Sequence, residues 1–467
     1  TLSANPDSPA ASVPVPTVGR LLQLAWPIVI SRSCQTVMGL ADAIMVAHLG
    51  KAALAATTTG ALNTMTFFVL PFGTVFIVSS FAAQLHGARD AAGARRYGFY
   101  GLAVAAITAV LSAFAVLLAP AALAQLGYEP EVRDLMTGYL QIRLLSAGAA
   151  IGIEALANYY GGLGNTRLPM LANVTAMTLN VPLNWVLING ANDLGIPALG
   201  VRGAALANAI ATTLAFVGLL GCFLAGLGEP ERAPRSKLRL DELYRTLRFG
   251  LPSGFNWFFE MLAFSFFVNV VVAGLGTTAL AALMSVLQIN GVAFMPGFAL
   301  ASAGAILVGQ AIGAGAKDTV PPTVRRTLAV ASTWMALMGA LYIVIPGLLM
   351  RPFLDGKEGS EELLRAGTRM LILSGLWQLF DAVSMTMAET LRAAGDTAYT
   401  MWARIAIAWL IFVPGTLVTV RVFGGGDVAA VGWVVGYLAL LSLVLWLRFR
   451  SGAWRKIDLT GEGPTGH

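Results

Sequence analysis

Apolar segments of about 20 residues or more recur along the whole chain, and each is long enough to cross the hydrocarbon core of a bilayer as a helix. Short runs rich in Gly, Pro and polar residues separate them, such as GLGNTRLP at 162–169. This pattern predicts an all-α polytopic membrane protein. The twelve predicted membrane helices lie at about 21–48, 53–84, 97–125, 137–161, 168–190, 200–227, 247–273, 278–311, 325–350, 366–393, 398–422 and 428–449.

The composition points the same way. Of the 467 residues, 57% are hydrophobic and only 12% are charged, whereas an average soluble domain is about 25% charged. The two cysteines, Cys34 and Cys222, lie far apart in apolar runs, which argues against a disulfide framework or a metal site. Residues 1–17 are rich in Pro and Ser and lack an apolar core, so we expect a disordered N-terminal tail and not a signal peptide.

Positive charges gather on alternate connections between the predicted helices. The longest of these, a basic linker at 228–246, leads into the seventh helix, and six basic residues lie between Arg232 and Arg248. Its side of the membrane holds 20 of the 30 Lys and Arg residues, so the positive-inside rule places this linker and both termini in the cytoplasm, with the chain in the inner (plasma) membrane. The same side holds Arg20, Arg89, Arg95, Arg96, Arg167, Lys317, Arg325, Arg326, Arg392, Arg404, Arg448, Arg450, Arg455 and Lys456.

The two halves of the chain resemble each other. A Gln-x-x-Gly motif at 84–87 recurs at 310–313, and GLGNTRLPM at 162–170 is matched by AAGDTAYTM at 393–401. We therefore expect two six-helix bundles, an N-lobe at 18–227 and a C-lobe at 247–450, followed by a C-terminal tail at 451–467. Because each half has an even number of helices, the bundles are expected to be related by a pseudo-twofold axis along the membrane normal. Transporters built in this way bind substrate between the halves and expose it alternately, which argues against a channel.

Five acidic residues fall inside the predicted membrane helices, where a charge costs at least about 2.5–3.5 kcal/mol. They do not follow the repeat, which favours separate functions over inheritance from a duplicated scaffold. Asn180 and Asn184 share one helix face, and together with Asp42 they predict a proton or cation site in the N-lobe, although the asparagines alone would also join helices. The five acids are Asp42, Glu154, Glu260, Asp381 and Glu389.

Glu260 and Asp381 form the predicted site of the C-lobe, where they would hold Na⁺, share a proton or attract a cationic substrate. The alternative for Glu260 is permanent neutralisation by an arginine, for which Arg32, Arg143 and Arg369 are the available partners, none at helical spacing. For Glu154 the sequence leaves both alternatives open, a functional acid or an acid neutralised by an arginine. Glu389 lies close to Arg392, which is typical of a surface pair.

Phosphate-binding, Cys/His metal-binding and nucleophile motifs are absent from the sequence. We therefore expect neither an enzyme nor a cofactor, and an ion gradient, worth about 2.3 kcal/mol per charge per 100 mV, is the remaining energy source. No nucleic-acid partner is expected. The expected partners are the bilayer and small organic molecules, and the expected state is a monomer.

The chain resembles the multidrug and toxic compound extrusion (MATE) family, in its NorM-like branch, over essentially its whole length. The resemblance is carried by MGLADAIMVAHLG at 38–50, FFE at 258–260 and LRAAGDT at 391–397. It implies antiport of mostly cationic, amphipathic compounds against H⁺ or Na⁺, with Asp42, Asn180 and Asn184 as one cation site and Glu260 and Asp381 as another.

One detail of the resemblance bears on mechanism. Trp377 stands where the branch is expected to carry a tyrosine ligand, which favours protons over sodium in the C-lobe. A flippase for a lipid-linked saccharide or peptidoglycan precursor, from the same superfamily, is the alternative function, and it would require central arginines. The predicted substrate cavity consists of Trp257, Phe258, Phe259, Met261 and Trp377, although these side chains are equally suited to packing or to lipid contact.

Overall fold

The computed structural model describes residues 14–125, 127–191, 195–231, 234, 236–354 and 360–461. Helices dominate this part of the chain, and the only β-pairing within it is an isolated bridge between Ala191 and Ile196. The α-helices are α1 (Val18–Ala47), α2 (Lys51–Val75), α3 (Ile77–Gly87), α4 (Ala91–Ala124), α5 (Pro130–Leu145), α6 (Ala147–Gly162), α7 (Arg167–Asn189), α8 (Val201–Ala225), α9 (Leu240–Phe266), α10 (Thr277–Gly313), α11 (Val320–Val344), α12 (Pro346–Met350), α13 (Ser360–Ala393), α14 (Thr397–Ala406), α15 (Val413–Arg421) and α16 (Asp427–Arg450).

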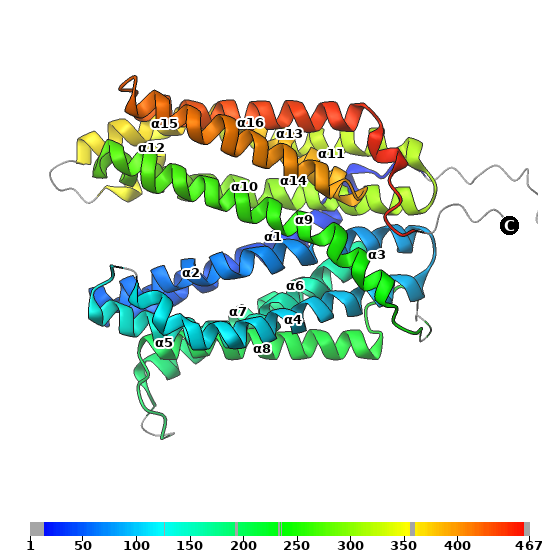
Figure 1. The fold of residues 1–467 in the computed structure, drawn as a ribbon, viewed down its shortest axis with the longest axis horizontal. Helices are drawn as coiled ribbons and strands as arrows, with labels where there is room; N and C mark the ends of the chain where they lie inside the picture. Colours follow the sequence, from blue (N-terminus) through cyan, green and yellow to red (C-terminus); the bar gives the residue numbers. More distant parts are fainter. Residues whose placement is uncertain are drawn as a thin grey trace, which may run out of the picture.

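The helices form two bundles that lie side by side, α1–α8 in the N-lobe and α9–α16 in the C-lobe (Figure 1). Ten helical runs in the described chain are long and apolar enough to cross a membrane, and the bent pair α5 and α6 makes an eleventh. The thirty-residue α1 is less apolar and completes the set. The twelve-helix, two-bundle prediction is confirmed.

Several predicted boundaries are wrong in detail. The span at 53–84 is divided at Phe76, shortly after Pro71, whose ring removes a backbone donor from the helix. The span at 137–161 begins earlier, at Pro130, and bends by 45° at Ser146, whose hydroxyl donates to the Arg143 carbonyl at 2.8 Å. The helix predicted from 366 begins at Ser360, and α9 begins at Leu240, inside the predicted linker at 228–246. Residues 232, 233 and 235 of that linker, and 1–13 of the N-terminal tail, lie outside the described residues.

Both described chain ends lie at one end of the bundles, which we call the terminal end (Figure 1). Between the lobes, α1 and α3 pack against α10, and α2 packs against α9. At the terminal end the Gln84 side-chain amide donates to the Ala393 carbonyl at 2.7 Å, and Gln310 donates to the Gly162 carbonyl at 2.9 Å. Both carbonyls belong to the last residue of a helix, where the backbone lacks an intrahelical donor. Each lobe therefore caps a helix end of the other.

The glycines of the repeated Gln-x-x-Gly motif allow this contact. A Cβ atom on Gly87 would lie 2.1 Å from the Gln310 carbonyl oxygen, and one on Gly313 would lie 1.7 Å from the Gln84 carbonyl oxygen. Only glycine permits backbones to approach so closely. The repeat in the sequence thus marks the point where α3 and α10 cross. We call these four residues the crossing.

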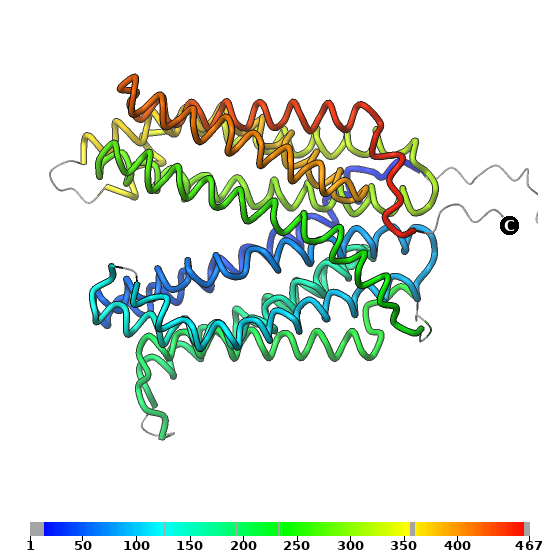
Figure 2. Tube along the Cα trace, in the orientation of Figure 1, coloured from blue at the N-terminus to red at the C-terminus, as the bar shows by residue number. Residues whose placement is uncertain are grey.

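After α16 the chain leaves the C-lobe and runs across the terminal end to the N-lobe, as the red segment in Figure 2 shows. Trp454 is buried in a C-lobe cluster with Leu441 and Leu445, whereas Leu459 is buried in an N-lobe cluster with Ile77 and Phe81. The first part of the predicted C-terminal tail therefore packs against both lobes. Residues 462–467 of that tail lie outside the described residues.

Gly313→Ala should weaken the contact between the lobes at the terminal end. The added methyl group overlaps the Gln84 carbonyl, and overpacking of this kind costs about 1–3 kcal/mol. We expect a lower melting temperature for the purified protein in detergent. Gly218→Ala is the matched control, because it lies on an exposed face of α8 with nothing within 4 Å of the added Cβ. Equal melting temperatures for the two variants would contradict the described crossing.

Candidate functional site

A cavity of about 460 Å³ lies between the lobes and is formed mostly by the C-lobe. Its lining is largely apolar, and α2 of the N-lobe contributes Met65 and Val69. Of the predicted substrate residues, Trp257, Met261 and Trp377 line it. Phe258 and Phe259, which were expected to line it as well, are absent from its wall. They stack edge-to-face with each other, with ring centroids 5.6 Å apart.

Glu260 lines this cavity in an ion pair with Arg404 of α14. Arg404 was expected in a cytoplasmic connection, and other arginines were expected as possible partners of Glu260; both expectations are wrong. The Arg404 side chain is only 12% exposed. The hydroxyl of Tyr437 from α16 is 3.5 Å from the second oxygen of Glu260. Because a charge in apolar surroundings requires a partner and further hydrogen bonds, this arrangement stabilises Glu260 as a carboxylate.

Asp381 lies in the same cavity but makes no ion pair with any described residue. Its hydrogen-bond partner is the hydroxyl of Ser384, one turn along α13, at 3.4 Å. The third carboxylate on the wall, Glu389, is paired with Arg392, so Asp381 is the one carboxylate of the cavity whose charge is not balanced by a described residue.

Three amide side chains that were not predicted from the sequence also line the cavity, Asn256, Asn290 and Gln378. Gln378 donates to Asn290 of α10, and Asn290 donates to Ser374 at 3.2 Å. The side-chain oxygens of Gln378 and Asn256 are buried without a partner among the described residues and are free to accept from a ligand. Gln378 precedes Asp381 by three residues and therefore shares its helix face, which is the signal that would have identified it.

The N-lobe contains a buried polar cluster around Asp42. Its two carboxylate oxygens accept from Asn184 at 2.6 Å and from Asn208 at 3.1 Å, and Asn184 also donates to Asn180 at 3.1 Å. Asp42, Asn180 and Asn184 thus come together as predicted from the sequence. Asn208 of α8 was missed, as was Arg143, which donates to the Asn208 side-chain oxygen. Asp42 itself makes no ion pair among the described residues, and the oxygen of Asn184 is buried without a partner.

The remaining two acids are each paired with an arginine. Glu154 accepts from Arg32 at 2.5 Å. Glu389 is paired with Arg392, but the expectation of a surface pair is wrong, because both side chains are buried. Arg392 also donates to the carbonyl of Phe76, where the division between α2 and α3 leaves that carbonyl available.

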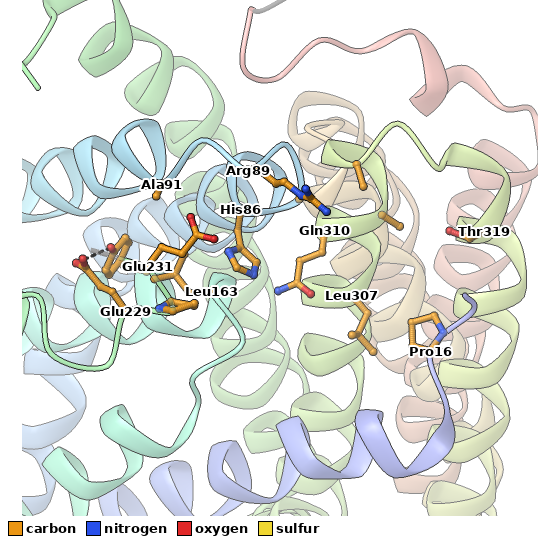
Figure 3. Close-up of a pocket in the computed structure, with 15 residues that line it drawn as sticks. Pro16, His86, Arg89, Ala91, Leu163, Glu229, Glu231, Leu307, Gln310 and Thr319 are labelled. Atoms are coloured by element: carbon orange, nitrogen blue, oxygen red, sulfur yellow. Dashed lines mark hydrogen bonds between the residues drawn. The ribbon is translucent and has the colours of Figure 1, made fainter. Parts of the chain in front are cut away.

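A second cavity, of about 340 Å³, opens at the terminal end beside the crossing. His86 and Gln310 reach it from α3 and α10, and Glu229 and Glu231 from the connection between α8 and α9 (Figure 3). Its lining mixes polar and apolar residues, and none of the five acids of the membrane helices contributes to it. We assign this cavity to the contact between the lobes and not to substrate.

Comparison with known proteins agrees with the geometry. A family model described as MatE matches residues 27–186 and 252–418. A probable multidrug resistance protein NorM of Photorhabdus laumondii is 26% identical, over 85% of this chain and 86% of the relative. The multidrug resistance protein PmpM of Pseudomonas aeruginosa is 28% identical, over 84% of this chain and 82% of the relative.

The fold is also found among solved structures. The crystal structure of MATE in complex with MaL6 superposes with a TM-score of 0.83 at 21% sequence identity. The match covers 94% of this chain and 97% of that one. At this level of identity the likeness establishes the fold, and with it the arrangement of the two bundles.

The pair of Arg32 and Glu154 should behave as a structural unit. Glu154→Gln or Arg32→Gln alone leaves a poorly solvated charge, and because Arg32 is 16% exposed we expect a loss of about 1–3 kcal/mol for each. The double variant removes both charges and should lose clearly less than the sum. Melting temperatures of the four proteins measure this cycle, and additive losses would contradict a direct pair.

Proposed function

The chain belongs to the MATE family of multidrug transporters, and on this premise we propose that it exports organic, mostly cationic and amphipathic compounds in exchange for protons or sodium ions. The family match extends over most of both bundles. The proposed location is the inner membrane, with the terminal end facing the cytoplasm, because the basic residues gather there.

The observation that carries the proposal is the position of Asp381. It is a carboxylate without an ion pair among the described residues, in an otherwise largely apolar cavity between two bundles. The aromatic rings of Trp257 and Phe294 line the same cavity. A lipophilic cation fits such a site, because apolar burial, attraction to aromatic faces and a single negative charge act together.

Exchange follows if substrate and coupling ion compete for the same carboxylate. A proton or inorganic ion on Asp381 removes the charge that attracts the organic cation, and binding of the organic cation disfavours the ion in return. Asp42, held by amide groups in the N-lobe, is the second carboxylate available for coupling. The crossing keeps the terminal end together, so alternation requires it to separate in the opposite state.

The arginines of the membrane region support a cationic rather than an anionic substrate. Arg32 is paired with Glu154 and Arg369 with Asp427 at 2.9 Å, while Arg143 donates to Asn208 in the cluster around Asp42 and does not line the cavity between the lobes. A pyrophosphate-linked lipid would need free guanidinium groups at the centre of the molecule. We therefore favour drug export over lipid flipping.

Asp381→Asn and Asp42→Asn should each lose gradient-driven efflux, because the coupling carboxylate becomes a neutral amide of the same shape. In inverted vesicles the cytoplasmic face points outward, so export is measured as accumulation of a fluorescent lipophilic cation added outside, and we expect losses of about tenfold or more, within the usual range of coupling between sites. A proton and a sodium gradient are imposed separately. Asp427→Asn, in the partly exposed pair with Arg369, is the control and should remain active. Normal efflux by both test variants would refute the proposal.

Trp257→Leu should weaken substrate binding by about 0.5–2 kcal/mol, because a ring face available to the cation is lost. Phe258→Leu alters the adjacent residue, which is absent from the cavity wall, and should have little effect. The measurement is the concentration of tetraphenylphosphonium that half-saturates efflux. A larger effect at Phe258 than at Trp257 would show that the cavity has been wrongly assigned.

A further inference from the structure

We propose that Arg404 acts as a built-in counter-cation of the C-lobe site, so that this site exchanges protons at Asp381 and does not bind sodium. The inference rests on the proposed function and specifies its coupling ion in one lobe. In this proposal Glu260 and Asp381 have different roles. Glu260 holds the guanidinium in place, and Asp381 alternates between proton and substrate.

The charges around the cavity support this division. The titratable and charged side chains on its wall are Glu260 from α9, Arg404 from α14, Tyr437 from α16, and Asp381 and Glu389 from α13. The residues of α2 and α10 on the wall are uncharged. Glu260 is balanced by Arg404, and Glu389 by Arg392 just outside the wall. The cavity therefore carries a net charge of one negative unit when Asp381 is ionised and none when it is protonated.

Arg404 is a permanent occupant of this site. A guanidinium keeps its proton under all conditions relevant to proteins. The helix that carries Arg404 packs directly against α9, and the Trp409 indole N–H donates to the Phe259 carbonyl at 3.3 Å, which ties the following turn to α9 as well. Leaving Glu260 without a partner in this apolar wall would be strongly unfavourable, so an incoming ion does not readily displace Arg404 from its ion pair.

Sodium finds a single free carboxylate in this arrangement. Hard cations in proteins collect about six oxygen ligands, with carboxylates prominent among them. The oxygens of Glu260 are engaged by Arg404 and face the hydroxyl of Tyr437, so Asp381 supplies the one free charge, and the hydroxyl of Ser384 and the amide oxygens of Gln378 and Asn256 add only neutral ligands. A proton needs only one oxygen, and it leaves a neutral acid in the apolar cavity. The site therefore fits H⁺ and not Na⁺.

The net charge also defines the class of substrate. One negative unit matches one positive charge, so the cavity is suited to monovalent lipophilic cations. A dication would meet Arg404 without a second free carboxylate. Arg404→Gln releases Glu260 and should create a site with two free carboxylates, which is suited to sodium and to dications.

Binding of radioactive sodium to purified protein tests the inference without transport. The N-lobe cluster is first silenced by Asp42→Asn, so that only the C-lobe contributes. We expect no saturable sodium binding in this background, clear binding after Arg404→Gln is added, and loss of that binding when Asp381→Asn is added as well. Sodium binding that depends on Asp381 while Arg404 is present would overturn the inference. Absence of any gain in a folded Arg404→Gln variant would overturn it equally.

A charge-balanced variant covers the possibility that Arg404→Gln does not fold. Glu260→Gln alone leaves Arg404 unbalanced beside Asp381, and proton-driven efflux should fall by about tenfold. Glu260→Gln together with Arg404→Gln removes both charges and should recover most of that loss, still without a response to sodium. Failure of the double variant to recover would reject the role of Arg404 as a counter-cation.

The two proposals fail in different ways. If wild-type vesicles show no gradient-driven efflux but the sodium-binding pattern appears, the exporter proposal fails and the counter-cation remains. If efflux depends on Asp381 but Arg404→Gln gains no sodium binding, only the counter-cation is refuted.

Discussion

A charge in hydrocarbon is stable only when another charge, a set of hydrogen bonds or a proton compensates it, and this requirement organises the centre of the molecule. Three of the five acids of the membrane helices, Glu154, Glu260 and Glu389, meet it with an arginine. The other two, Asp42 and Asp381, make no ion pair among the described residues. They lie in different bundles and are compensated by hydrogen bonds, Asp42 by two asparagines at 2.6 and 3.1 Å and Asp381 by one serine hydroxyl at 3.4 Å.

The arginine pairs do more than neutralise acids. Arg392 joins Glu389 to the carbonyl that the division at Phe76 makes available in the other lobe. At the crossing, side chains also satisfy backbone groups of the other lobe, because Gln84 and Gln310 each donate to a helix-end carbonyl across the interface. The two helix-end carbonyls, of Ala393 and Gly162, therefore receive their donors from the other lobe.

The sequence predicted the helices well because a bilayer forces the backbone to satisfy its hydrogen bonds within each segment, so apolar length alone identifies a span. The repeated Gln-x-x-Gly motif identified the crossing residues but not their contact, since pairing across an interface leaves no local pattern. Arg404 was misplaced for the same reason. Its partner Glu260 lies 144 positions earlier in the chain, and hydropathy assigns a charge near a helix end to the adjoining connection.

Other errors were avoidable. Glu260 and Met261 follow Trp257 by three and four positions and therefore lie on the same helix face as Trp257. Phe258 and Phe259 do not belong to this face. Applying that periodicity would have selected the residues that line the cavity. Asn208 was a harder case. It is a single amide in an apolar helix, and only its position beside Asp42 distinguishes it from the amides that join helices.

The segment after α16 sets a limit on motion. Trp454 is seated in one bundle and Leu459 in the other, and only five residue steps separate them. A fully extended chain of that length reaches at most about 17 Å. While both side chains remain buried in their clusters, residues 454–459 limit how far the two bundles can separate at the terminal end. The maximum width of a passage that opens on that side is therefore set by covalent geometry.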